Sequence, residues 1–223
     1  MKKGKILHIN QAITEIKSKI INCMILSYWD TDHILLFSLD TLLTSSTIFI
    51  IPNLENYNRR YKTVFAMRLF RFLCSKFFKE VYVIDEKYSK QIVLNYDYIK
   101  ISTGKFSSSS DGTNYCNTQM NNFELVIMLN HNNKRVLIPG DCDYKVMNKT
   151  FIHYDYDLLL VSHHGAKIGK PPKETQNESL AIICCSDKYD NPDNETIETL
   201  KELGYQQIIK FKNMSRSRYI YPF

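Results

Sequence analysis

The stretch FELVIMLNHNNKRVLIPGDCD, residues 123–143, does most to decide the fold of this chain. It holds two apolar runs, 123–129 and 135–139, and the polar segment NHNNK joins them. Two such runs around a short Asn-rich turn predict an antiparallel hairpin. Because Gly140 and Asp141 follow the second run directly, we expect a carboxylate at the end of this strand.

Further apolar runs alternate with helical patterns on both sides of the hairpin. Upstream, we expect strands over 23–27, 48–51, 81–84 and 91–102, and helices over 11–21, 33–43 and 57–79. Downstream, we expect a short helix over 143–151, strands over 157–162 and 180–186, and a helix over 193–203 that ends at Gly204. Alternating strands and helices predict an α/β layered fold. No break in composition divides the chain, so we expect one domain over 1–223.

The composition is that of an ordinary globular protein, with 44% hydrophobic and 23% charged residues. No stretch approaches the roughly 18 apolar residues of a spanning helix, and the N-terminal region lacks a signal-peptide pattern. We therefore expect a soluble, cytoplasmic protein without a transmembrane segment. The six cysteines form no C-x-x-C pair, which argues against a zinc ribbon or a thioredoxin-like site.

Positive charge is concentrated in the segment 57–80, although the net charge of the whole chain is only +6. Seven basic residues there accompany a single acid, Glu80; they are Arg59, Arg60, Lys62, Arg68, Arg71, Lys76 and Lys79. Positive potential attracts anionic partners, and Arg68 and Arg71 are candidates for anionic-ligand binding. Apolar residues alternate with the basic ones at helical spacing, and we expect them to face the core; they are Val64, Phe65, Leu69, Phe72, Leu73 and Phe77.

Three segments place potential metal ligands directly after an apolar strand. They are YWDTDH (28–33), Gly140-Asp141, and SHHG (162–165). Loops at strand ends are where rigid scaffolds present reactive side chains. Carboxylate oxygens and imidazole nitrogens together suit zinc, manganese or iron. Each segment alone is a weak signal, but their order along the chain favours one shared metal site.

This order of strands and motifs resembles the metallo-β-lactamase superfamily of hydrolases, and is closest to the C-terminal hydrolase domain of ComEC-type DNA-uptake competence proteins. The run 123–143 looks like the strand–turn–strand–TGD segment of that group. LLLVSHHGAKIG (158–169) looks like its VPHHGSK segment, and KYDNPDNETIETLKELGY (188–205) looks like its C-terminal tail. The similarity covers about residues 121–206, and the DTDH segment extends it upstream to about residue 24. It implies a four-layer αββα sandwich.

The resemblance also implies which residues hold the metal. The family motif H-x-H-x-D-H falls on Tyr28, Asp30, Asp32 and His33, so the Asp-His half is kept and both leading histidines are absent. Asp32, His33, Asp141 and His164 would form one nearly complete site. A weak second site would have Tyr28, Asp30 and Asn122. We therefore expect Zn²⁺ or Mn²⁺, and one ion rather than two.

The chain departs from the family pattern in its N-terminal part. Only 27 residues precede Tyr28, so we expect the first β-sheet to be incomplete. A truncated chain, a lineage that has lost the sheet, and a partner chain or second copy that completes it are the open alternatives. An incomplete sandwich exposes strand edges and apolar surface, which favours association.

The resemblance implies a phosphodiesterase or nuclease-like hydrolase that acts through a metal-activated water on an anionic substrate, with nucleic acid as a candidate. Asp32 would orient the water, and His163 or Lys167 would stabilise charge on a substrate oxygen. The competing hypothesis is a catalytically silent binding or interaction protein with a degenerate metal site, motivated by the missing histidines. A nucleic-acid or membrane-surface module built on the 57–80 helix is a further alternative.

Overall fold

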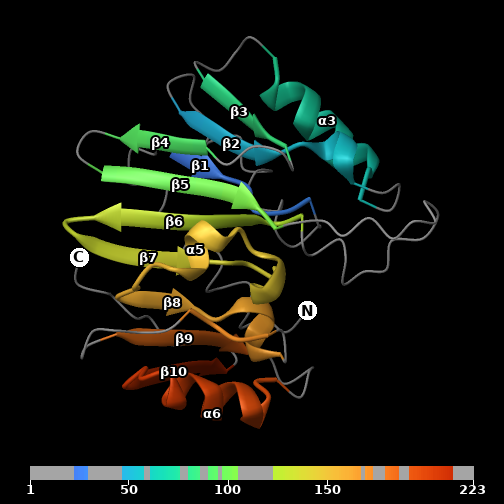
Figure 1. The fold of residues 1–223 in the computed structure, drawn as a ribbon. Helices are drawn as coiled ribbons and strands as arrows, with labels where there is room; N and C mark the ends of the chain where they lie inside the picture. Colours follow the sequence, from blue (N-terminus) through green and yellow to red (C-terminus); the bar gives the residue numbers. More distant parts are fainter. Residues whose placement is uncertain are drawn as a thin grey trace. The chain divides into compact units, whose positions relative to one another are not determined.

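The computed structural model describes residues 23–29, 47–57, 61–75, 80–85, 90–94, 97–104, 123–166, 169–172, 179–185 and 191–212. The expected helices 11–21 and 33–43 lie outside these residues. The described residues up to Val83 belong to one compact unit, and those from Ile84 onward belong to a second. The strands form two sheets, and helices occur between them along the chain, which confirms the α/β class (Figure 1). The single domain over 1–223 stays a prediction.

The second unit is built on a seven-stranded sheet with the order β10-β9-β8-β7-β6-β5-β4 (Figure 1). Neighbours from β4 to β7 pair antiparallel, and neighbours from β7 to β10 pair parallel. The strands are β4 (Lys90–Leu94), β5 (Asp97–Thr103), β6 (Leu125–His131), β7 (Lys134–Ile138), β8 (Leu158–Leu160), β9 (Leu180–Cys185) and β10 (Gln207–Lys212).

The expected hairpin is confirmed as β6 and β7, with a tighter turn than the sequence pattern indicates. His131 pairs with Lys134, so only two residues connect the strands. Both of these, Asn132 and Asn133, have positive φ angles of 49° and 62°. Two positive φ angles are typical of a type I′ turn, which matches the right-handed twist of the strands and which asparagine tolerates.

Two other parts of the sheet differ from the expectation. The segment 91–102, expected as one stretch of strand structure, contributes to two antiparallel strands, and Leu94 pairs with Asp97. The edge strand β10 follows Gly204 and was not expected at all. Its sequence, QIIKFK, mixes apolar and charged residues, and its parallel pairing with β9 is a contact that periodicity does not reveal.

The main core of the second unit lies on one face of this sheet. Side chains of a strand alternate between its faces, so Val126 and Met128 of β6 lie on the same side as Ala181 and Ile183 of β9. The short helices α5 (Lys149–Ile152) and α6 (Asn194–Glu202) contribute Phe151 and Leu200 to this core. The Asp193 side chain accepts the backbone N–H of Glu195 and caps α6, which confirms the helix expected to start at this residue.

The first unit holds a three-stranded sheet with the order β1-β2-β3. Its strands are β1 (Cys23–Ile25), β2 (Ile48–Pro52) and β3 (Glu80–Ile84), and β1 pairs parallel with β2. A 3-10 turn, Leu54–Asn56, and the helix α3 (Val64–Leu73) lie between β2 and β3. Trp29 is buried beside them; its indole N–H donates to the Pro52 carbonyl at 2.7 Å, and its ring meets Phe70 at 5.7 Å between centroids.

The helix α3 is shorter than the expected span 57–79. Thr63 begins it, because its side chain accepts the N–H of Ala66, and the described helix ends at Leu73. The expectation that its apolar residues face the core is only partly right. Leu69 and Leu73 are buried, whereas Val64, Phe65 and Phe72 are exposed; Phe77 lies outside the described residues.

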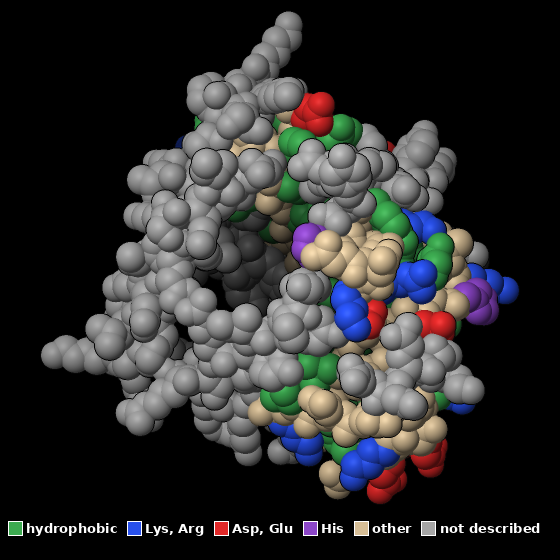
Figure 2. Space-filling view, turned by 90° about the vertical axis from the view of Figure 1, so that its left-hand side faces the viewer, with side chains coloured by type: hydrophobic (Ala, Val, Ile, Leu, Met, Phe, Trp, Pro, Cys, Tyr) green, Lys and Arg blue, Asp and Glu red, His purple; other side chains and the backbone are tan. Residues whose placement is uncertain are grey.

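Acidic and basic side chains are interspersed on the face drawn in Figure 2. In the second unit, Lys134 forms an ion pair with the buried Asp157 at 2.9 Å, and Asp157 also accepts the backbone N–H of Arg135. Within the part of the chain that the structure describes, no helix is long and apolar enough to cross a membrane.

Candidate functional site

The turn after β7 presents Asp141 through a backbone conformation that suits glycine. Gly140 has a φ of +60°, and a Cβ added there would overlap the carboxyl group of Glu124. The carboxylate of Glu124 accepts the backbone N–H of Asp141, and Cys142 donates its N–H to the Pro139 carbonyl at 3.3 Å. These two hydrogen bonds fix the backbone of the turn at Asp141.

Glu124 is a residue of this site that sequence reasoning missed. It directly precedes β6 and is only 1% exposed, although it carries a carboxylate. A buried carboxylate is expensive unless hydrogen bonds compensate it, and the N–H of Asp141 supplies one such bond. The sequence does contain a signal for Glu124: it is the only acid in the apolar run 123–129, and a buried strand rarely contains a charged residue.

The turn after β8, Ser162–Gly165, is tied to the turn after β7. His163 donates its backbone N–H to the Gly140 carbonyl at 3.1 Å, and the hydroxyl of Ser162 donates to the Cys142 carbonyl at 2.7 Å. The backbone N–H of Ser162 donates to the hydroxyl of Tyr144 at 3.0 Å. The two loops that carry the predicted ligands Asp141 and His164 thus form one hydrogen-bonded structure.

Both histidines of this turn have a left-handed backbone. The φ and ψ angles are 47° and 42° for His163, and 58° and 22° for His164. Residues with a Cβ rarely adopt this region, and such local strain clusters at functional sites. Two successive left-handed residues reverse the chain sharply, so the two imidazoles leave the strand end at different angles; their planes are 72° apart.

The imidazole of His164 is oriented by a carbonyl group. Its Nδ1 lies 2.6 Å from the carbonyl oxygen of Cys184, at the end of β9. Since a carbonyl can only accept, Nδ1 carries a proton, and the tautomer with this proton has its lone pair on Nε2. This is the arrangement of a metal-binding histidine whose second nitrogen is held by a backbone oxygen. The side chain is exposed, so Nε2 is accessible.

The environment of His163 is different. Its Nδ1 is buried and has no hydrogen-bond partner within the described ranges. His163 interacts electrostatically with the carboxyl group of Asp143. Burial raises the pKa of that carboxyl group, and the positive charges of Lys145 and His163 offset part of the rise. The ring of His163 is therefore within electrostatic range of the Asp143 carboxyl group.

Cys142, in the turn after β7, is not a ligand candidate. Cys142 is fully buried, and burial, with the nearby carboxylates of Glu124 and Asp143, raises the pKa of its thiol far above neutral pH. Because the thiolate is the metal-binding form, a protonated buried thiol acts as a small core residue.

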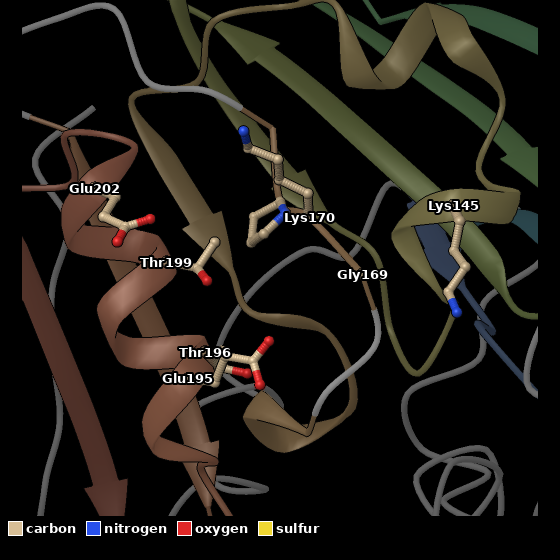
Figure 3. A pocket seen from close by; sticks show the side chains of 8 residues that line it. Lys145, Gly169, Lys170, Glu195, Thr196, Thr199 and Glu202 are labelled. Carbon is tan, nitrogen blue, oxygen red and sulfur yellow. The ribbon is translucent and has the colours of Figure 1, made fainter.

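A pocket of about 510 Å³ lies along α6 in the second unit. Figure 3 shows Glu195, Thr196, Thr199 and Glu202 on α6, with Lys170 facing this helix and Lys145 on a separate segment. The hydroxyl of Thr196 also donates to the Ala166 carbonyl at 3.3 Å, directly after the histidine turn. The lining carries both positive and negative groups.

The described residues contain only part of the predicted site. Asp141, His163 and His164 are brought together by the two turns, whereas Asp30, Asp32, His33, Asn122 and Lys167 lie outside the described residues. Tyr28 is buried in the first unit, where its ring packs on Tyr57 and Tyr61. Arg68 and Arg71 are exposed on α3. Within the described ranges, no group of three or more His, Cys, Asp or Glu side chains could hold a metal ion.

No protein-family model matches this chain, and no curated protein matches its sequence.

Proposed function

We propose that this chain is a metal-dependent hydrolase of the metallo-β-lactamase type that cleaves a phosphodiester, with nucleic acid as a candidate substrate. The observation that carries the proposal is the hydrogen bond from His164 Nδ1 to the Cys184 carbonyl, in a turn that is itself hydrogen-bonded to the Asp141 turn. An exposed imidazole held in this tautomer, on a turn bonded to one that carries an aspartate, suits a metal-binding strand end. The proposed architecture is the four-layer αββα sandwich of that superfamily.

In this proposal the ligands are Asp141 and His164, together with Asp32 and His33 from the sequence motif, and the ion is a single Zn²⁺ or Mn²⁺. A bound ion would supply a Lewis acid that lowers the pKa of water from near 16 to about 7. Glu124 keeps Asp141 in position through the backbone, and the Cys184 carbonyl keeps His164 in its tautomer. His163 and Lys167 would stabilise negative charge on the substrate.

The second candidate is a binding protein that keeps the scaffold and has lost catalysis. Tyr28 favours it, because this residue takes the place of the first motif histidine and is only 4% exposed. Its ring lies 5.4 Å from the ring of Tyr57 and 5.2 Å from that of Tyr61. An aromatic side chain packed in this way contributes to the core of the first unit and is a poor replacement for an imidazole ligand.

Metal content and hydrolysis of a model phosphodiester separate the two candidates. The purified chain is loaded with Zn²⁺ or Mn²⁺, dialysed, and analysed for bound metal, and cleavage of bis(p-nitrophenyl) phosphate is then followed. We expect metal binding and hydrolysis, and loss of both in Asp32→Asn, Asp141→Asn and His164→Gln. The matched control is His131→Gln at the exposed end of the β6–β7 hairpin. A chain that retains no metal and cleaves nothing refutes the hydrolase and leaves the binding protein.

A further inference from the structure

The helix α3 has a narrow buried side and a wide outward side. Ala66, Leu69 and Leu73 are buried at the spacing of one helical face, and Phe70 packs on Trp29. The other six residues project outward. They are Val64, Phe65, Met67, Arg68, Arg71 and Phe72, and we call them the outward face of α3.

Apolar surface is concentrated on this outward face. Val64 is 61% exposed, Phe65 45%, Met67 36% and Phe72 46%. The only other large hydrophobic residue that is comparably exposed within the described ranges is Val83. Single exposed apolar residues are common on proteins, but four on a ten-residue helix form a cluster of the kind that marks an interaction surface.

The charge on this face has one sign. Arg68 and Arg71 are its only charged residues, and the sequence contains no acid between residues 57 and 79. Lys62 does not add to the face, because its ammonium group binds Glu55 through the backbone carbonyl at 2.9 Å and the carboxylate at 3.5 Å. This single sign contrasts with the face in Figure 2, where acidic and basic side chains are mixed. The partner of the outward face should therefore be apolar and anionic.

We propose that the outward face of α3 binds the surface of a membrane that contains anionic lipid. Aliphatic and phenyl side chains enter the boundary between headgroups and acyl chains, while arginines bind lipid phosphates, and both requirements are met here. Nucleic acid fits less well: Phe65 and Phe72 could stack on bases, but the aliphatic surface of Val64 and Met67 could not, and only the arginines could hydrogen-bond to them. A second copy of the chain fits less well too, because it would bring Arg68 and Arg71 against like charges. The proposal does not depend on the metal site.

Sedimentation with lipid vesicles tests the proposal. The full chain is mixed with vesicles of phosphatidylcholine alone, or of three parts phosphatidylcholine to one part phosphatidylserine. We expect binding only to the anionic vesicles, and weaker binding at high salt. Arg68→Gln with Arg71→Gln should weaken it about 25-fold, since each cation near an anionic surface contributes about fivefold. Phe65→Ser with Phe72→Ser should weaken binding by at least a comparable factor.

Two controls keep the result specific. Lys149→Gln with Lys201→Gln removes the same charge from exposed positions in the second unit, and Val83→Ser removes apolar surface from β3. We expect both variants to bind like the unaltered chain. Equal loss in the Lys149/Lys201 variant would show a non-specific effect of net charge and overturn the proposal. Absence of vesicle binding, or binding of a single-stranded oligonucleotide that only the arginine changes abolish, would also overturn it.

Discussion

Replacing Gly140 by alanine should strongly destabilise the chain, for two separable reasons. The first is the backbone: at a φ of +60°, a residue with a Cβ costs about 1–2 kcal/mol more than glycine. The second is space, because the new Cβ would overlap the carboxyl group of the buried Glu124. If Glu124 moves away, the N–H of Asp141 loses a charged acceptor, at a cost of about 1.5–3 kcal/mol.

The two terms together predict that Gly140→Ala lowers the free energy of unfolding by about 2.5–5 kcal/mol. Urea unfolding followed by circular dichroism measures this value. The same substitution in a Glu124→Ala background should be less harmful, because the overlapping carboxyl group is gone and only the backbone term of about 1–2 kcal/mol remains. The coupling free energy between the two positions should therefore be about 2 kcal/mol. The reasoning is refuted if Gly140→Ala has the same effect in both backgrounds, or costs less than about 1 kcal/mol by itself.

Three further predictions concern polar groups that folding removes wholly or partly from water. Tyr156→Phe should cost about 1–3 kcal/mol in urea unfolding, because the buried hydroxyl donates to the Phe151 carbonyl at 2.6 Å and phenylalanine leaves that oxygen unsatisfied; a neutral result would mean that water replaces the hydroxyl. Asp157→Asn should lower the free energy of unfolding by about 2 kcal/mol, because Asp157 is buried and also accepts the N–H of Arg135. Lys134→Gln should lower it by less than about 1 kcal/mol, because the Lys134 side chain is partly exposed. The reverse order of the two effects would contradict this. Burial raises the pKa of Cys23 to about 11 from an ordinary value of 9.0, so its contribution to stability is full below pH 9 and declines as the pH rises to 11. Over that interval the unfolding free energy of Cys23→Ala should therefore fall less steeply than that of the unaltered chain, and parallel pH profiles would disprove the assignment.

The sequence by itself determined the elements whose signals act within a few residues. The β6–β7 hairpin follows from two apolar runs and the Asn132-Asn133 turn, because asparagine tolerates positive φ angles. The helix α6 follows from the Asp193 cap and Gly204, and the position of Asp141 at a strand end follows from the residues beside it. These features could be predicted because local backbone preference decides them.

Only the tertiary structure decided the features that depend on residues far apart in the chain. The proton position on His164 is set by a carbonyl 20 residues away, and the Asp141 turn is held by Glu124, 17 residues upstream. The exposure of Phe65 and Phe72 depends on which side of α3 packs on Trp29. Helical periodicity does not settle this, because α3 carries its own apolar residues on every side. A side chain's neighbours are chosen by packing of the whole unit, so its hydrogen bonds and burial cannot be derived from local sequence.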